Sequence, residues 1–352
     1  MQTAAVWTRR MNKMLVFTAS ILLFALGIVL MKDGARSLAP LIERWLDLRR
    51  PLPSLAAGWL ASMIIMSGSP IAAVALALLD SGLMTATSAF TMIMGSRFGA
   101  SFIVLCVGFI YALRGRSLLN SLSMGLLSFA ITISLHVIGL VPGIWLLQTD
   151  WLLRVPRPRG VAVTSVVDLL FEPVRLTLSG FVPLWSFFGI GFLFIMLSFA
   201  LLDRALPTES LKAAHFDQIA QFVYRPSVMF LLGAVVTLIS MSVSLSVSIL
   251  VPLSDRGLMR RENVIPYIMG ANITTFVDTL LASLLMETPQ AFDVVLAEMV
   301  SVGVAALFIL AFAFRPYEVA METFVEWVTA HPSRVVLFLV VLFAVPAVGL
   351  FM

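Results

Sequence analysis

The sequence predicts an all-α integral membrane protein made of two inverted-topology repeats, each with a re-entrant helical hairpin and a broken transmembrane helix. Three observations lead to this fold class. Hydrophobic residues make up 60% of the chain and charged residues only 12%, whereas a soluble domain carries about 25% charged residues. Several apolar runs reach the roughly 20 residues that cross a bilayer core of about 30 Å. Finally, the chain resembles itself when it is shifted so that Gly58 aligns with Gly233.

Nine apolar segments are candidates for membrane elements. They lie near residues 14–31, 54–79, 85–113, 121–147, 183–202, 227–253, 263–286, 292–314 and 334–352. Two of them contain polar interruptions, at Met66–Pro70 and at Met241–Ser246. Proline removes a backbone donor and serine competes for backbone hydrogen bonds, so we expect a broken, re-entrant helix at both places.

The shift that places Gly58 on Gly233 aligns these two interrupted segments without a gap. Between Gly58 and Leu105 it gives 14 identities in 48 positions. Leucine and isoleucine recur by chance in apolar helices, but Asp, Gly and Ser shared at one offset are hard to obtain that way. Asp80 with Asp255 is one such pair, and we expect both to be turn or cap residues at hairpin ends. The sequence therefore predicts an internal duplication.

Each predicted repeat crosses the membrane three times, because a re-entrant hairpin returns to its own side. An odd number of crossings makes the second repeat enter from the opposite face, which is the plan of many secondary transporters with a site near the midplane. The expected parts are a first repeat at 1–148, a connector with Pro and Arg at 149–182, a second repeat at 183–315, and a C-terminal amphipathic stretch with the last span at 316–352.

Composition excludes several other classes of protein. Cys106 is the single cysteine of the sequence, which rules out a disulfide framework or a CxxC site. His136, His215 and His331 show no metal-binding spacing, so we expect no enzyme. The net charge of +4 comes from cations scattered over loops, which indicates contact with lipid headgroups and no nucleic acid. We expect a multi-pass protein of the cell (inner) membrane, and a homo-oligomer is compatible with the sequence.

The interruptions carry hydroxyl groups at matching positions. A helix broken at mid-membrane exposes free N–H groups, which attract anions. Ser67 and Ser69 stand at the first break, and Ser242 and Ser244 stand at the second. We predict that these four serines converge near the midplane and bind the substrate.

A second break is predicted in each repeat, at Gly95–Ala100 and at Gly270–Thr275. Near the latter the chain concentrates oxygen donors of the kind that bind sodium. The predicted sodium ligands are Thr237, Asn272, Thr274, Thr275 and Asp278. Asp278 is a candidate because a carboxylate inside an apolar segment is costly and is therefore usually functional.

Arg97 stands where the second repeat has Asn272. A guanidinium group cannot lose its proton in a protein and is costly inside a membrane unless it is paired. We predict that Arg97 faces Asp278, another carboxylate or the substrate anion, as a fixed charge that replaces a bound cation. The alternative is that Arg97 reaches a lipid headgroup from the end of a span.

These motifs resemble the type II sodium-phosphate cotransporter family, whose halves each carry Gly-x3-Thr-x3-Gln-Ser-Ser-Ser and then Gly-Ala-Asn-Ile-Gly-Thr. The matching positions are Gly233, Thr237, Met241–Ser244 and Gly270–Thr275, and in the first half Gly58, Ser62, Met66–Ser69 and Gly95–Ala100. Both glutamines are replaced, by Met66 and Met241, and the middle serines by Gly68 and Val243. The resemblance covers about residues 14–314 and implies sodium-coupled phosphate transport. We expect a transport core alone, with no soluble regulatory domain after the last span.

Two functions remain open at this stage. The sequence favours a secondary active transporter of a small inorganic, phosphate-like oxyanion, with Na+ as the coupling ion and the lipid bilayer as its surroundings. The alternative is a non-transporting membrane sensor or partner subunit built on the same scaffold. An uptake assay separates the two.

Overall fold

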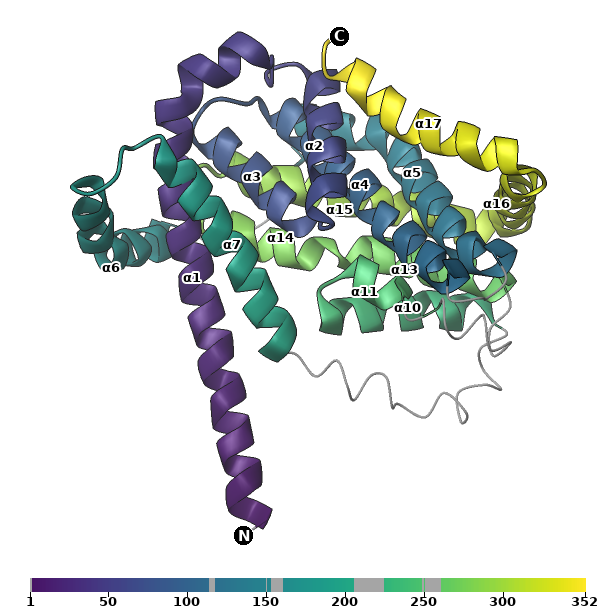
Figure 1. The fold of residues 1–352 in the computed structure, drawn as a ribbon, viewed down its shortest axis with the longest axis horizontal. Helices are drawn as coiled ribbons and strands as arrows, with labels where there is room; N and C mark the ends of the chain where they lie inside the picture. The colour runs from purple at the N-terminus through teal and green to yellow at the C-terminus, as the bar shows by residue number, and fades with distance from the viewer. Residues whose placement is uncertain are drawn as a thin grey trace.

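The computed structural model describes residues 2–113, 118–149, 151–152, 161–205, 225–248, 250 and 261–352, and its regular elements in these ranges are helices (Figure 1). They are α1 (Gln2–Trp45), α2 (Pro51–Ile65), α3 (Ser69–Asp80), α4 (Ala86–Leu113), α5 (Leu118–Gln148), α6 (Val161–Ser179), α7 (Ser186–Ala205), α10 (Pro226–Ser240), α11 (Val243–Ser248), α13 (Arg261–Thr274), α14 (Phe276–Ser283), α15 (Gln290–Phe308), the π-helical segment η2 (Ile309–Ala313), α16 (Phe314–Thr329) and α17 (Pro332–Gly349).

Within the described ranges, six helical runs are long and apolar enough to cross a membrane. They are Lys13–Leu41, Ala86–Ile110, Leu122–Gln148, Glu262–Ser283, Gln290–Thr329 and Pro332–Gly349. Each overlaps one of the predicted apolar segments, so the prediction of an all-helical, multi-pass membrane protein is confirmed.

Both predicted interruptions are real breaks in the helices. The helix α2 ends at Ile65 and α3 begins at Ser69, whereas α10 ends at Ser240 and α11 begins at Val243. With 15 and 12 residues, α2 and α3 are about 22 and 18 Å long at 1.5 Å per residue. Neither helix alone spans a bilayer core of about 30 Å.

The predicted break at Gly95–Ala100 is wrong. The helix α4 runs without interruption from Ala86 to Leu113, and its two glycines in this stretch serve close packing against α2. A Cβ added to Gly95 would stand 2.0 Å from the carbonyl oxygen of Leu55, and one added to Gly99 would stand 2.2 Å from that of Trp59. In the second half α13 ends at Thr274 and α14 begins at Phe276, but Thr275 between them keeps helical backbone angles (φ −60°, ψ −24°) and bonds its N–H to the carbonyl oxygen of Ala271 at 3.2 Å. The predicted break at Gly270–Thr275 is therefore only a local irregularity in one helical run, Glu262–Ser283.

The two halves repeat the same packing at the offset found in the sequence. Gly58 of α2 approaches the carbonyl oxygen of Met92 so closely that a Cβ would lie 2.1 Å away, and Gly233 of α10 approaches that of Tyr267 at 2.0 Å. The reciprocal contact recurs as well, since Gly270 meets the carbonyl oxygen of Phe230 as Gly95 meets that of Leu55. The pair α2–α4 therefore has the same close helix contact as the pair α10–α13.

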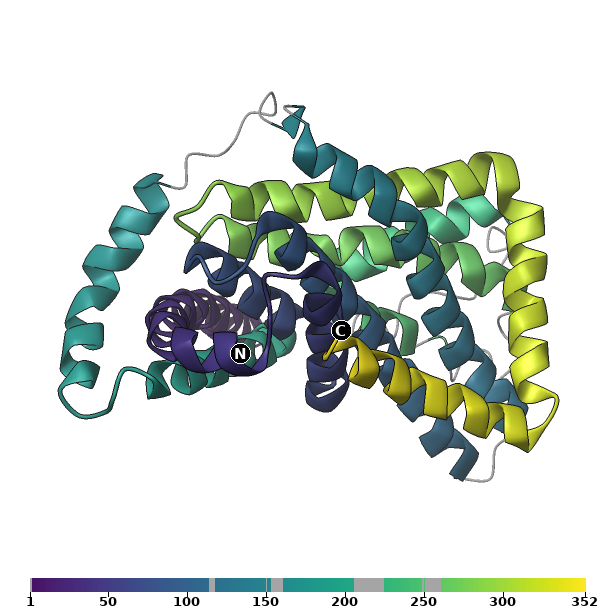
Figure 2. The ribbon, with the colours of Figure 1, turned by 90° about the horizontal axis from the view of Figure 1, so that it is seen from above.

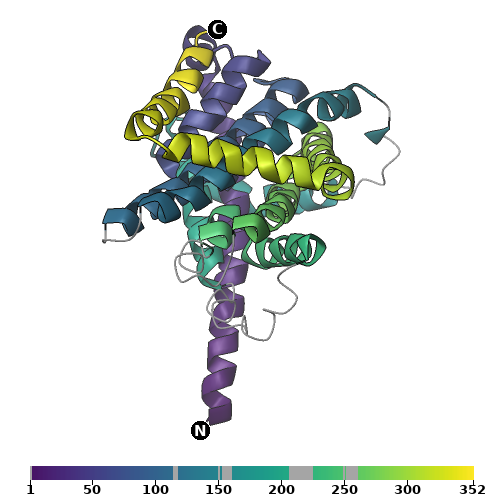
Figure 3. The ribbon, with the colours of Figure 1, turned by 90° about the vertical axis from the view of Figure 1, so that its right-hand side faces the viewer.

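Several other helices lie at the periphery of these two helix pairs. The helix α1 lies along α7 and extends below the bundle, so the termini lie at opposite ends of the molecule (Figures 1 and 3). The predicted connector contains α6, which lies on the outer side of α1, while its Arg154–Arg159 stretch falls outside the described residues. Past η2 the chain turns sharply, and α16 and α17 border the other side of the bundle (Figure 2).

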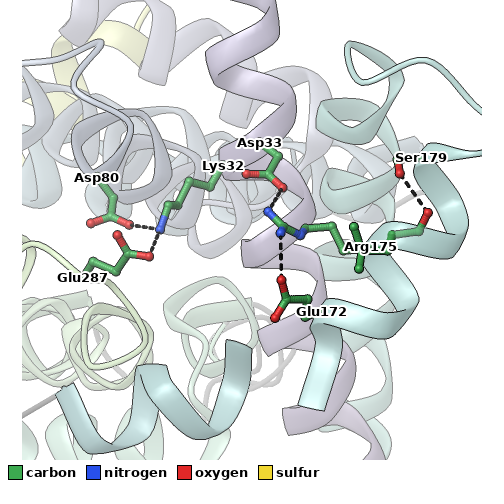
Figure 4. Close-up of polar contacts among 8 residues, drawn as sticks. Lys32, Asp33, Asp80, Glu172, Arg175, Ser179 and Glu287 are labelled. Atoms are coloured by element: carbon green, nitrogen blue, oxygen red, sulfur yellow. Dashed lines mark hydrogen bonds and ion pairs between the residues drawn. The ribbon is translucent and has the colours of Figure 1, made fainter. Parts of the chain in front are cut away.

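Ion pairs join α1 to its neighbours (Figure 4). Lys32 pairs with Asp80 at the end of α3, at 3.3 Å, and with Glu287 after α14. Asp80 also accepts a hydrogen bond from the backbone N–H of Thr288 at 2.7 Å. The next residue of α1, Asp33, pairs with Arg175 of α6 at 3.1 Å. Asp80 is thus a contact between the two halves of the chain, and Asp255 lies outside the described residues.

The Lys32 pairs should contribute measurably to stability. We expect Lys32→Met to lower the free energy of unfolding by about 1–3 kcal/mol, because it leaves the buried Asp80 carboxylate with one partner fewer. The matched control Arg175→Met breaks a more exposed pair and should cost at most about 1 kcal/mol. Thermal unfolding of the two variants in detergent measures the difference, and equal losses would contradict the expectation.

Candidate functional site

Both helix breaks hold a methionine in the left-handed backbone region. Met66 has φ 59° and Met241 has φ 50°, and among the described residues no other non-glycine residue has a positive φ. Such a conformation costs about 1–3 kcal/mol and persists where the surrounding structure enforces it, often at functional sites. The shift that places Gly58 on Gly233 also places Met66 on Met241, so the strained geometry occurs at matching positions of the two segments.

A cavity of about 260 Å³ lies between the two breaks. Its polar lining comes from both halves: Ser67 and Ser69 from the first break, Ser242 from the second, Arg97 and Ser101 from α4, Thr132 from α5, and Asn272 and Thr275 from the α13–α14 junction. The side chain of Ser244 lies outside the described residues. Three of the four predicted substrate-binding serines therefore share one cavity with Arg97.

Arg97 is buried at this cavity, with 5% of its surface exposed. Its Nη2 donates to the hydroxyl of Thr279 at 2.7 Å and lies 3.8 Å from Oδ1 of Asp278. Its Nη1 donates to Thr275 at 3.4 Å, and the guanidinium lies 4.9 Å from the centre of the Phe276 ring. Arg97 thus faces the α13–α14 junction and does not reach toward a headgroup.

The replacement of a family serine by Gly68 leaves room for this arginine. A Cβ at position 68 would stand 3.0 Å from the carbonyl oxygen of Ser96 and 3.4 Å from Nη1 of Arg97. A Cβ there would therefore be tight against the backbone of α4 and would touch the guanidinium. Gly68 and Arg97 both depart from the cotransporter motif that the sequence resembles, and they lie next to each other in the structure.

The five predicted sodium ligands do not surround one point. Thr237 donates to the hydroxyl of Ser246 at 2.8 Å, and Thr274 donates to the carbonyl oxygen of Ala234 at 2.8 Å. Asn272 lines the cavity and accepts from Thr132 at 3.3 Å. The other two, Thr275 and Asp278, face Arg97. A positive side chain therefore occupies the place where the sequence predicted a cation, and sodium binding by these residues stays a prediction.

Several residues near Arg97 were missed by the sequence reasoning. Thr279 links Arg97 to Asp278, because its hydroxyl accepts a hydrogen bond from Arg97 and donates one to Asp278 at 2.8 Å. Glu298 of α15 is buried, and it interacts electrostatically with Arg97. A carboxylate in the apolar run 292–314 is the same signal that selected Asp278, so Glu298 could have been found. Thr132 and Thr279 carry no comparable signal, because isolated hydroxyls are common in apolar helices.

Comparison with known proteins bears on the second half of the chain. Residues 200–328 match the model of the Na+/Pi-cotransporter family. Neither the curated proteins nor the solved structures gave a match. The matched stretch includes Ser242, Asn272, Thr275 and Asp278, whereas Arg97 and the first break precede it. The match supports phosphate transport in general. Residues 200–328 are therefore similar to the Na+/Pi-cotransporter family, whose members are transporters and not enzymes.

Proposed function

We propose that the chain is a secondary active transporter that moves phosphate, or an inorganic oxyanion of similar shape, across the cell membrane. The observation that carries the proposal is the cavity to which both breaks contribute serines and α4 contributes a buried arginine. The family match supports phosphate as the substrate. A volume of about 260 Å³ is below the roughly 300–1,000 Å³ of sites for drug-sized ligands and suits a small ion.

The anion would bind between Arg97 and the serines of the breaks. The planar guanidinium matches the geometry of an oxyanion, and the hydroxyls of Ser67, Ser69 and Ser242 are able to donate to the remaining oxygens. The helix α3 begins at Ser69, so the positive end of its dipole adds to the attraction. These groups replace part of the hydration shell that the anion loses.

Alternating access would follow from an inverted relation between the two halves. The common bounds of α2 and α10, the two left-handed methionines and the reciprocal glycine contacts all recur at the same offset along the chain. In transporters built from inverted repeats, the two halves exchange conformations around a fixed midplane site. We take the short, paired helices α2 and α3 as the re-entrant hairpin of the first half.

Arg97 would act as a permanent cation in this site. The family match over residues 200–328 supports sodium coupling in general. However, the guanidinium contacts Thr275 and Asp278 and would repel a second cation there. The fixed charge would supply, in every state of the cycle, the attraction that a bound ion supplies elsewhere in the family.

Uptake of radiolabelled phosphate into liposomes containing the purified protein tests the proposal. Single alanine replacements of Ser67, Ser69 and Ser242 should each raise the half-saturating phosphate concentration about tenfold, because a hydrogen bond to a charged group contributes about 1.5–3 kcal/mol. The control Ser179→Ala, at an exposed serine of α6, should leave uptake unchanged. Phosphate binding without any uptake would refute transport and support the sensor function.

A further inference from the structure

Glu298 is a buried carboxyl group near the candidate site. It lies in the middle of α15, where only 1% of its surface is exposed. Neither of its carboxyl oxygens has a hydrogen-bond partner within the described part of the chain. An ionised carboxylate without partners in an apolar interior costs several kcal/mol, whereas the protonated form avoids most of that cost. Glu298 is therefore suited to hold a proton in this conformation.

The helices packed against α15 carry several charged and titratable groups. Among the described side chains they are Arg97 and Cys106 of α4, His136 of α5, Asp278 of α14, Asp80 at the end of α3, Glu262 and Tyr267 of α13, and Asp293 of α15 itself. Asp80 is engaged by Lys32, and the hydroxyl of Tyr267 is engaged by Ser246. Arg97 is the buried cation on α4, a helix that packs against α15, and it interacts electrostatically with Glu298.

Arg97 therefore interacts with the carboxyl groups of Asp278 and Glu298 and also lines the cavity. Its charge is balanced by Asp278 alone when Glu298 is protonated, so the centre is neutral. Ionisation of Glu298 adds a negative charge to a low-dielectric region, where it would oppose any anion that enters the cavity beside Arg97. Anion binding and proton binding consequently favour each other, and this coupling is reciprocal.

His136 is the other nearby group that could hold a proton. Its Nδ1 donates to the carbonyl oxygen of Thr132 at 2.7 Å, which leaves Nε2 as a bare acceptor without a partner among the described residues. However, a proton on His136 would place a second positive charge within the field of Arg97. Glu298 is the better proton carrier, because protonation removes a charge from the membrane interior.

We propose that Glu298 is a proton-binding site that couples anion transport to proton movement, in an extension that rests on the proposed transport function. The carboxylate takes up one proton from water on the side where the anion enters. The neutral carboxyl group crosses with the bound anion when the halves exchange conformation. After the anion leaves, the O–H bond breaks and the proton passes to water on the other side, which restores the carboxylate.

Phosphate uptake into liposomes with an imposed pH gradient tests this proposal. An inward proton gradient should accelerate uptake by the wild-type protein at least severalfold, and Glu298→Gln should abolish that acceleration. The neutral amide mimics the protonated state, so phosphate exchange between equal concentrations on both sides should survive in the variant. The pH gradient also changes the ionisation of phosphate, but this effect is the same for the wild type and for Glu298→Gln, so it does not affect the comparison between them. Glu318→Gln, at a buried glutamate paired with Arg315, is the matched control and should respond to the gradient like the wild type.

An infrared measurement gives a second readout that does not depend on transport. The wild-type protein should show the carbonyl stretch of a protonated carboxylic acid, and this band should be lost in Glu298→Gln but kept in Glu318→Gln. If the wild type takes up phosphate in a sodium gradient yet ignores the pH gradient, proton coupling is overturned while transport stands. A pH dependence that disappears in His136→Gln but persists in Glu298→Gln would also overturn the assignment. Absence of phosphate uptake and exchange under every gradient would instead reject the transport function itself.

Discussion

Replacing Arg97 with leucine is expected to abolish phosphate uptake and to destabilise the fold. The substitution removes the positive charge that lines the cavity and leaves Asp278, 3.8 Å away, as an uncompensated buried carboxylate. Breaking a buried ion pair by removing one partner costs about 3–5 kcal/mol. The loss of a charge-assisted contact to the anion should lower uptake at subsaturating phosphate by about 100-fold.

The double variant Arg97→Leu/Asp278→Leu separates these two effects. Replacing a buried pair with apolar side chains is often neutral for stability, so unfolding should return close to that of the wild type while uptake stays lost. Arg97→Lys should retain the charge but bind phosphate more weakly, because an ammonium group lacks the planar pair of donors. Normal uptake by Arg97→Leu would show that the anion does not depend on this side chain. If the double variant regains uptake, the role of Arg97 is to compensate the charge of Asp278 and not to bind the anion.

Alanine at Gly58 or Gly233 is expected to be the most damaging of the small substitutions. The added Cβ would lie 2.1 or 2.0 Å from a backbone oxygen of the facing helix, and a backbone cannot move aside as a flexible side chain does. Overpacking typically costs about 1–3 kcal/mol, and we expect losses at the upper end of that range. Since the contacts are equivalent in the two halves, the two variants should lose similar stability.

Gly189→Ala in α7 is the matched control for this comparison, because no atom lies within 4 Å of its added Cβ. It should unfold like the wild type. The midpoint of thermal unfolding and the monodisperse fraction after detergent extraction measure the effect. If Gly58→Ala and Gly233→Ala match the control, the helices are not held at the separation that the structure shows.

Local chemistry allowed the sequence to determine the helices, the two main breaks and the repeated pattern. Apolar length selects a membrane span, and serine and proline interrupt a helix wherever they occur together. Both effects act within a few residues of the chain. For this reason the breaks at Met66 and Met241 were predictable without knowledge of the neighbouring helices.

The glycines of α4 could not be interpreted from local sequence alone. A missing Cβ permits either a break or a close helix contact, and the sequence around Gly95 does not distinguish them. The choice is made by α2, which packs its backbone against Gly95 and Gly99. The break predicted in α4 was wrong because the competing contact comes from Leu55 and Trp59, which belong to a different helix.

The sequence selected the residues of the candidate site, but the tertiary structure decided which of these residues contact one another. The sequence selected Arg97 and Asp278 because charges are costly in a membrane. It could not show that Thr237 and Thr274 are engaged by Ser246 and by a carbonyl oxygen of α10. Hydrogen bonds and charge pairs depend on distances of a few ångströms between helices far apart in sequence. For Arg97 these distances are set by the tertiary fold, which places its side chain at the α13–α14 junction.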